Sequence, residues 1–427
     1  MIVQKQPRQV SHPLRLQAAV IVLLGVCCVL PACRGDNLAC DDPLGCIEIE
    51  RNEPVVLAAL LPLSGDAAYL GEEALGSIEI AMADQGGGIL DHPLTLTSAD
   101  SGCQAITARA SVESLIADFP DLVGIVGPIC TAVAEATLPL VSQAGLVMVS
   151  PANTAVSLTN PATAAGGLWR PGYYRTAPPN TRQAQAAAEF AAQTLGARTA
   201  AVIFTDDSQT QELADTFVHT FRQSGGVVAF QGSISAGVTD LTELLIGAMS
   251  SSPDVLYLPV LEPEGNLIVN AISRTTSFAE TTLIGGMGLF VPSFPVGVGS
   301  SAVNDMFVVG PVVQGVGAEA LQAEWQDRFG AAPGGPVYGQ TYDAVNLLLA
   351  AIEAVAQEGR NGALLIGRQA LRDALTQTAV FPGVTGPLTC SPYGDCAAST
   401  AVGLYQFSQA QVNGETWPPE LVWTITD

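Results

Sequence analysis

Lysine is almost absent from this chain, which has a single lysine, Lys5, among 427 residues. No other lysine is available for a Schiff base or for a phosphate-binding loop. Histidine is scarce too, since only His92 and His219 lie beyond the first 32 residues. The chain has no HExxH, GxSxG or CxxC motif, and a loose dinucleotide-turn match at Gly315–Ala320 is, as a lone match, more typical of a helix entry. We therefore expect no catalytic residue, no metal and no cofactor, and predict that the protein is not an enzyme.

Positive charge is also in short supply. The chain has 16 Lys and Arg against 40 Asp and Glu, a formal net charge of −24 with His neutral. The first 32 residues hold three of the basic residues and no acid, which leaves about −27 on the remainder. Such a chain repels phosphate backbones and anionic lipid surfaces, so we expect no nucleic acid among its partners.

Long apolar runs are missing except near the start. Leu16–Val29 is apolar, follows basic residues and is too short to span a bilayer comfortably. The sequence Leu30-Pro31-Ala32-Cys33 follows it and resembles the lipobox of bacterial lipoproteins. We interpret residues 1–32 as a signal peptide and Cys33 as a lipidated first residue, so that the exported protein is anchored to a bacterial membrane by lipid, in the periplasm or at the cell surface. The alternatives are an ordinary signal peptide cleaved near Ala32 and an uncleaved anchor.

The six cysteines beyond Cys33 form an even set, which in an exported protein predicts disulfides. Fifteen connectivities are open in principle. Cys40 with Cys46 and Cys390 with Cys396 are close in sequence and easily joined, which leaves two cysteines, Cys103 and Cys130. Residues 33–54 have little periodicity and several turn-forming residues, so we predict a tether there.

The stretch from Leu122 to Thr154 predicts a strand, a turn, a helix near Thr131–Gln143, a second strand and a second turn. Short apolar strands alternate with helices through the rest of the chain, which is long enough for two domains. The fold class is therefore α/β, with two doubly wound parallel-sheet lobes. Both turns of the stretch follow strands, at the edge where open α/β sheets bind ligands, and the first one leads into a helix N-terminus that favours an anion.

Several ordered motifs carry a family resemblance. The motifs are Leu61-Pro62-Leu63-Ser64-Gly65, Gly87-Gly88-Ile89, Ile125-Val126-Gly127-Pro128-Ile129-Cys130-Thr131, Val149-Ser150-Pro151-Ala152-Asn153-Thr154, Tyr342-Asp343-Ala344-Val345 and Gly386-Pro387-Leu388. Together they resemble the type I periplasmic binding proteins, Leu/Ile/Val-binding branch, from Val55 to Asp427.

The resemblance implies three crossings between lobes, near Arg175, Val308 and Gly386. It places residues 55–175 and 309–385 in the N-terminal lobe and residues 176–308 and 386–427 in the C-terminal lobe. It also implies a Cys103–Cys130 disulfide, which would join the loop after the second strand to the binding turn.

The ligand site is also implied by the resemblance. Thr131 stands where a hydroxyl holds the ligand carboxylate; its alternative role is to cap the helix. The other first-lobe positions are Ser64, Tyr69, Ala152, Asn153 and Thr154.

The second-lobe half departs from the family pattern. Met287 stands where an acidic residue would hold a ligand ammonium, Thr210 replaces an aromatic residue, and Glu262 lies where tyrosine is usual. Glu262, Asp206 and Asp207 are candidates for a replacement charge; the alternative is that these acids are simply solvated.

The leading hypothesis is a lipid-anchored solute-binding protein of an ABC-type uptake system. It would bind a small ligand, amino-acid-like or another carboxylate, between two hinged lobes, and a transporter permease would recognise the closed form. The alternative is an envelope lipoprotein that uses the fold as a sensor or scaffold without transport, because Arg34 after Cys33 favours the outer membrane under enteric sorting rules.

Overall fold

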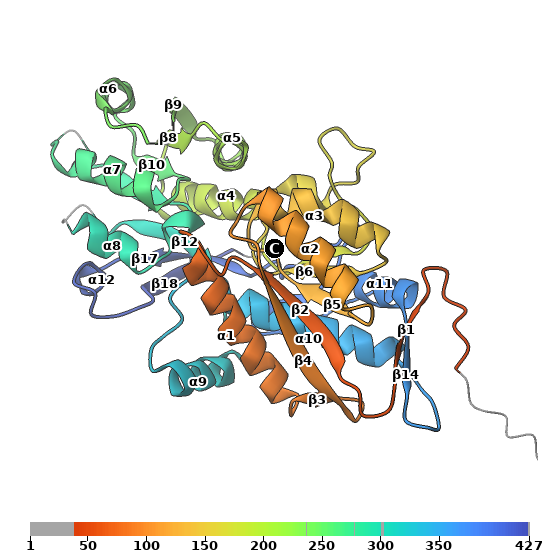
Figure 1. Ribbon diagram of the computed structural model, residues 1–427. Helices are drawn as coiled ribbons and strands as arrows, with labels where there is room; N and C mark the ends of the chain where they lie inside the picture. Colours follow the sequence, from red (N-terminus) through yellow and green to blue (C-terminus); the bar gives the residue numbers. More distant parts are fainter. Residues whose placement is uncertain (1–37, 236, 277, 300–302, 426–427) are drawn as a thin grey trace, which may run out of the picture. The chain divides into compact units, whose positions relative to one another are not determined.

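The computed structural model describes residues 38–235, 237–276, 278–299 and 303–425, and its elements are labelled in Figure 1. The predicted signal peptide and the predicted lipidation site, Cys33, lie outside the described residues. No helix in the described part of the chain combines the length and the apolar character needed to cross a bilayer.

The first sheet has six strands in the order β3-β4-β2-β5-β6-β7, and all its pairings are parallel except that of β3 with β4. Alternate residues of β2 enter two different cores, because successive side chains of a strand point to opposite faces. Leu57 and Leu61 pack with α1 and α10, whereas Val56 and Leu60 pack with α2 and α3. The elements are β2 (Val55–Leu61), α1 (Ala68–Asp84), β3 (Gly88–Ile89), β4 (His92–Asp100), α2 (Ala105–Asp118), β5 (Gly124–Val126), α3 (Thr131–Gln143), β6 (Val147–Ser150), β7 (Tyr173–Arg175) and α10 (Tyr338–Val355).

The second sheet has seven strands in the order β18-β17-β12-β11-β10-β8-β9, of which β17 and β18 run antiparallel to their neighbours. One face packs against α4 and α5, and the other packs against α6, α7 and α8. The elements are α4 (Asn180–Glu189), β8 (Thr199–Thr205), α5 (Ser208–Gln223), β9 (Val227–Ile234), α6 (Thr242–Ser250), β10 (Val255–Leu258), α7 (Glu262–Ser273), β11 (Thr282–Gly285), α8 (Ser293–Val298), β12 (Phe307–Pro311), β17 (Val402–Gln406) and β18 (Glu420–Thr424).

Smaller elements complete the two lobes. They are β1 (Cys46–Ile49), α9 (Ala318–Phe329), β13 (Gln357–Glu358), β14 (Leu364–Gly367), α11 (Arg368–Thr376), β15 (Phe381–Gly383), β16 (Gly386–Leu388), α12 (Gln409–Val412), the short helices η1 (Val156–Thr159) and η3 (Met287–Leu289), and the π-helical turn η2 (Phe190–Thr194). Two mainly parallel sheets, each covered by helices on both faces, confirm the predicted fold class.

Three expectations about chain course are wrong. Cys46–Ile49 is a strand rather than part of a tether, because Ile47 and Ile49 are buried and β1 pairs with β14. The chain does not return to the first lobe at Val308, since β12 pairs with β11 and β17 in the second sheet. The last crossing also comes later than Gly386. Residues up to Cys396 still bond to the first lobe, where the Cys396 N–H donates to the Arg175 carbonyl.

The six described cysteines are joined as Cys40–Cys46, Cys103–Cys130 and Cys390–Cys396. Cys103–Cys130 closes the longest of the three loops, with a sequence separation of 27.

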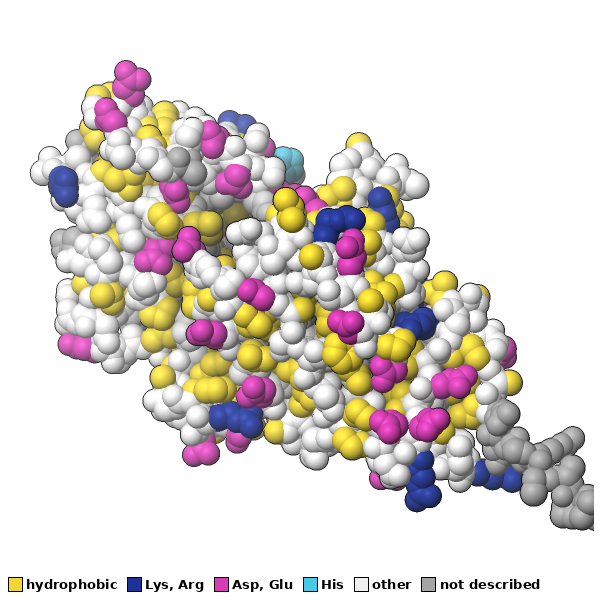
Figure 2. Space-filling view, viewed as in Figure 1, with side chains coloured by type: hydrophobic (Ala, Val, Ile, Leu, Met, Phe, Trp, Pro, Cys, Tyr) yellow, Lys and Arg dark blue, Asp and Glu magenta, His cyan; other side chains and the backbone are white. Residues whose placement is uncertain are grey.

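Two buried carboxyl groups hold distant segments against the first sheet. Both Glu73 oxygens accept backbone N–H groups, from Gly335 at 2.6 Å and from Val337 at 3.0 Å. Asp343 accepts the N–H groups of Val384 and Thr385 at 2.7 and 3.0 Å. Burial raises the pKa of Glu73 to about 7 and that of Asp343 to about 6, in spite of these bonds. Most other acids are exposed, and they are spread over the face shown in Figure 2.

These pKa shifts predict a pH dependence of stability. The folded protein binds the Glu73 proton more tightly than the unfolded chain does, so the contribution of Glu73 to the free energy of unfolding is complete below its ordinary pKa of 4.5 and is lost as the pH rises to about 7. This contribution is about 3 kcal/mol at 1.36 kcal/mol per pKa unit. Urea unfolding of the wild-type protein and of Glu73→Gln at several pH values should show this loss as a change in their stability difference. Glu73→Gln should be less stable throughout but should show a shallower slope; an equal slope in both proteins would contradict the prediction.

The Cys103–Cys130 bond should be recovered from the exported protein by peptide mapping without reductant. Closing a loop of this length is expected to stabilise the protein by about 3–4 kcal/mol. The Cys103→Ser/Cys130→Ser variant should therefore melt clearly below the wild-type protein, and equal melting temperatures would count against the stabilising role.

Candidate functional site

The carboxyl ends of β2, β4, β5 and β6 meet at one edge of the first sheet, because these strands are parallel. Ligands of open α/β sheets bind at this edge. The loops that follow the four strands are tied to one another by side-chain bonds, so the edge is a single connected surface.

The turns after β5 and β6 are joined by two short bonds. The Ser150 hydroxyl donates to the Pro128 carbonyl at 2.7 Å, and the Asn153 amide donates to the Ile129 carbonyl at 2.8 Å. Glycine is required at position 127, at the start of the turn after β5, since its φ is +118° and a Cβ there would lie 2.3 Å from the Leu60 carbonyl oxygen. The Asn153 side chain also accepts the Tyr173 hydroxyl and is 1% exposed. Asn153 is thus buried, with both ends of its side-chain amide bonded to neighbouring groups, and it shapes the site from within.

The loops after β2 and β4 are joined at Asp100. Its carboxylate accepts the Ser64 hydroxyl at 2.5 Å and the N–H groups of Leu63 and Gly102, both at 2.8 Å. The disulfide between Cys103 and Cys130, with Cα atoms 5.5 Å apart, connects this pair of loops to the turn after β5. Ser64 is exposed beside the turn, and Asp100 fixes its hydroxyl in place.

The N-terminus of α3 opens at this surface. Its N-cap residue is Cys130, whose side chain makes no cap bond, and Thr131 is the first helical residue. The alternative role of Thr131 as the cap is therefore wrong. Among the described residues its hydroxyl has no hydrogen-bond partner, although the side chain is only 9% exposed. The Val133 N–H donates to the Cys130 carbonyl at 3.1 Å, whereas the N–H groups of Thr131 and Ala132 have no partner among the described residues. With the Thr131 hydroxyl, these two N–H groups are unpaired donors that this turn offers to an anion. Ala152 and Thr154 lie partly exposed in the adjoining turn.

In the second lobe, Thr210 belongs to the cap of α5. Its hydroxyl donates to the Thr205 carbonyl at 2.7 Å and bonds the Asp207 carboxylate at 2.8 Å. Asp207 also accepts the N–H groups of Gln209 and Thr210 as the N-cap residue, and Asp206 accepts the Ser235 hydroxyl at 2.6 Å. Both acids are thus occupied by bonds inside their own lobe.

Glu262 begins α7 and accepts the Ser293 hydroxyl at 2.7 Å. Its charge also acts on the first lobe: burial, followed by the fields of Glu262 and Glu73, raises the pKa of Tyr69. Tyr69 lies in the first turn of α1 and is 49% exposed.

Met287 begins η3 directly after β11 and packs against the second-lobe core. The position where the family pattern places an acid thus carries an apolar thioether. No group of three or more His, Cys, Asp or Glu side chains within the described ranges is placed to hold a metal ion.

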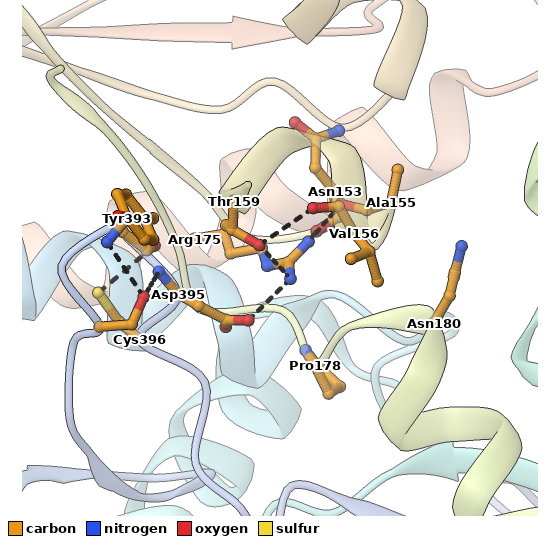
Figure 3. A network of polar contacts seen from close by, with 12 residues as sticks. Asn153, Ala155, Val156, Thr159, Arg175, Pro178, Asn180, Tyr393, Asp395 and Cys396 are labelled. Carbon is orange, nitrogen blue, oxygen red and sulfur yellow. Dashed lines mark hydrogen bonds and ion pairs between the residues drawn. The ribbon is translucent and has the colours of Figure 1, made fainter. Parts of the chain in front are cut away.

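Arg175, at the end of β7, is a residue whose importance the sequence did not reveal beyond a crossing point. It is 0% exposed, and Figure 3 shows its guanidinium enclosed by polar groups. It donates to the Ala155 carbonyl at 2.7 Å, the Thr159 hydroxyl at 2.9 Å and the Asp395 carboxylate at 2.8 Å. Arg175 thereby connects the loop after β6, which contains Ala155 and Thr159, to the segment around Asp395, where the chain last crosses between the lobes. The sequence feature that could have indicated this role is an arginine directly after two tyrosines, Tyr173 and Tyr174.

Comparison with known proteins finds chains of similar sequence and fold. The chain is 24% identical over 365 residues to the Leu/Ile/Val-binding protein BraC3 of Rhizobium johnstonii, covering 84% of this chain and 93% of that protein. Its fold is similar to that of a branched-chain amino acid transporter substrate-binding protein of Streptococcus pneumoniae in complex with isoleucine (TM-score 0.70, 18% identity, 87% and 100% of the two chains). It is likewise similar to a solute-binding protein of an ABC transporter of Rhodopseudomonas palustris in complex with p-hydroxybenzoic acid (TM-score 0.72, 19% identity, 87% and 97%).

These relatives are named as binding proteins, and the expectation that the chain is not an enzyme is confirmed. The family model described as "Periplasmic binding protein" matches residues 54–411, most of the described chain. The chain therefore belongs to the periplasmic binding proteins.

Proposed function

We propose that this protein is a lipid-anchored, extracytoplasmic solute-binding protein of an ABC-type uptake system, and that it binds a small carboxylate ligand between its two lobes. The observation that carries the proposal is the open N-terminus of α3. Thr131 has a hydroxyl without a partner among the described residues, the first-turn N–H groups have no cap, and Ala152 and Thr154 lie in the adjoining turn.

A carboxylate suits these donors. The positive end of a helix dipole and its unpaired N–H groups stabilise a negative charge, and a hydroxyl adds one further hydrogen bond. The bonds from Ser150, Asn153 and Asp100 hold the surrounding turns in place before a ligand arrives, which lowers the entropy lost on binding.

The second lobe decides what else the ligand carries. Isoleucine and p-hydroxybenzoic acid, found in two similar structures, both have a carboxylate, but only isoleucine has an ammonium group. Met287 supplies no charge for an ammonium, whereas Glu262 supplies one from the first turn of α7. Ligands of both kinds therefore belong in the binding screen, and native mass spectrometry of the purified protein tests for a molecule retained from the cell.

Uptake requires a transporter in the membrane and a binding protein that is held close to it. A lipid on Cys33 would hold the protein at a bacterial membrane without a spanning helix. Closure of the lobes around the ligand would then produce the form that a transporter permease recognises.

Thr131→Ala should weaken a carboxylate ligand roughly tenfold to a hundredfold, since a hydrogen bond to a charged group contributes about 1.5–3 kcal/mol. The melting temperature of the ligand-free protein should hardly change, because the hydroxyl has no partner within the described chain. Calorimetric titration with isoleucine and p-hydroxybenzoate, beside a melting curve, measures both quantities. Thr131→Ser keeps the hydroxyl and should retain most of the affinity. Lower stability with intact affinity would move the carboxylate to Ser64 and Thr154.

Cys33→Ser should release the protein from the membrane fraction or leave its precursor unprocessed, because the acceptor of the lipid is gone. Fractionation and mass measurement of the mature N-terminus report the result. Normal processing with unchanged membrane retention would rule out the lipid anchor.

A further inference from the structure

Glu212, in the first half of α5, reaches from the second lobe to Val156, in the loop after β6. Its Oε2 atom accepts the backbone N–H of Val156 at 3.4 Å and the side-chain amide of Asn180 at 2.8 Å. Val156 begins η1, two residues beyond Thr154 in the first lobe. One carboxylate oxygen therefore bonds both lobes.

The two bonds of Glu212 differ in kind. Asn180 begins α4, which packs along α5 in the second-lobe core, so the Asn180–Glu212 bond remains within one lobe. Val156 belongs to the first lobe, so the Val156–Glu212 bond changes length whenever the lobes move apart. Asn180 is 2% exposed, and it holds the carboxylate in position for Val156.

The loop that receives this contact is already tightly held. Arg175 donates to the Ala155 carbonyl at 2.7 Å, and the Asn180 backbone N–H donates to the Thr154 carbonyl at 2.8 Å. Figure 3 shows Ala155 and Val156 on this loop, with Arg175 beside it and Asn180 at the start of its helix. A displacement of Val156 would therefore also displace the turn that carries Ala152 and Thr154.

We propose that Glu212 is a positioning residue that favours the closed arrangement of the lobes and so raises ligand affinity. This inference rests on the proposed function, binding between the lobes. Glu212 makes no contact with the ligand in this scheme: apparent affinity scales with the fraction of molecules in the binding-competent state, and a bond that is stronger in the closed arrangement increases that fraction. The Val156–Glu212 distance of 3.4 Å is longer than the usual 2.9–3.0 Å, so the bond can still shorten as the lobes close.

Val156→Pro is the sharpest test when it is compared with Val156→Ala, because it deletes the donor N–H of the bond between the lobes, which Val156→Ala keeps. Proline is well tolerated at the first position of a helix. The preceding Ala155 has φ −58° and ψ 131°, a conformation that proline permits in its neighbour. Val156→Ala measures what loss of the side chain alone contributes. Glu212→Ala removes the acceptor, whereas Glu212→Gln can place an amide oxygen where Oε2 lies.

Titration with isoleucine and p-hydroxybenzoate should show affinity about five- to tenfold weaker for Val156→Pro than for Val156→Ala, and a similar loss for Glu212→Ala. Glu212→Gln should recover most of it. The variant combining Val156→Pro with Glu212→Ala should be no weaker than the weaker single variant, since both remove the same bond. Unchanged affinity in the single variants, or additive losses in the combined one, would overturn the proposal.

Small-angle scattering of the ligand-free full-length mature protein tests the same inference without a ligand. Val156→Pro and Glu212→Ala should have a larger radius of gyration than Val156→Ala and the wild-type protein. Equal radii would overturn the role of Glu212, whatever the titrations show. Failure of the proposed carboxylate site would instead appear as intact affinity in Thr131→Ala, so the two failures are distinguishable.

Discussion

One buried cation, Arg175, connects the loop after β6 with the segments in which the chain crosses between the lobes. Arginine remains charged in proteins, and a charge removed from water must be compensated by close acceptors. Arg175 finds them on both sides, in the Ala155 carbonyl and Thr159 hydroxyl of the binding loop and in the Asp395 carboxylate of the last crossing. Asp395 lies inside the loop closed by Cys390–Cys396. The need to satisfy one guanidinium thus brings the segment around Asp395, 220 residues further along the chain, to Arg175 and the loop that contains Ala155 and Thr159.

The two halves of the candidate site are built in different ways. In the first lobe the ligand would meet backbone N–H groups and the Thr131 hydroxyl, on turns braced by Asp100, Ser150 and a disulfide. In the second lobe it would meet side chains such as Met287 and Glu262 on loops after parallel strands. A backbone site changes little when side chains are substituted, whereas a side-chain site changes with each substitution. Under the proposed function, this division would let the first lobe keep an anion-binding site while the side chains of the second lobe change.

Many elements were predictable because their signals are local. The helix Thr131–Gln143 has the predicted bounds. Its apolar periodicity and its bounding turn residues lie within a few positions of one another. Cys46–Ile49 escaped prediction because its partner β14 lies more than 300 residues away, and Phe307–Pro311 was assigned to the wrong lobe because the pairing of an apolar strand cannot be read from its own residues.

The candidate site could likewise be predicted only in part from the sequence. By itself the sequence determined the fold class, the turns at the strand ends and the residue types that line them, since these follow from hydrophobic pattern and turn chemistry. Only the tertiary structure decided what each polar group does there. Asn153 and Thr210 are occupied by neighbouring backbone and side-chain groups, Thr131 is left without a partner in the described chain, and Glu212 reaches the other lobe. Hydrogen-bond partners are set by distances across the fold, and those distances exist only once both sheets and their crossings have formed.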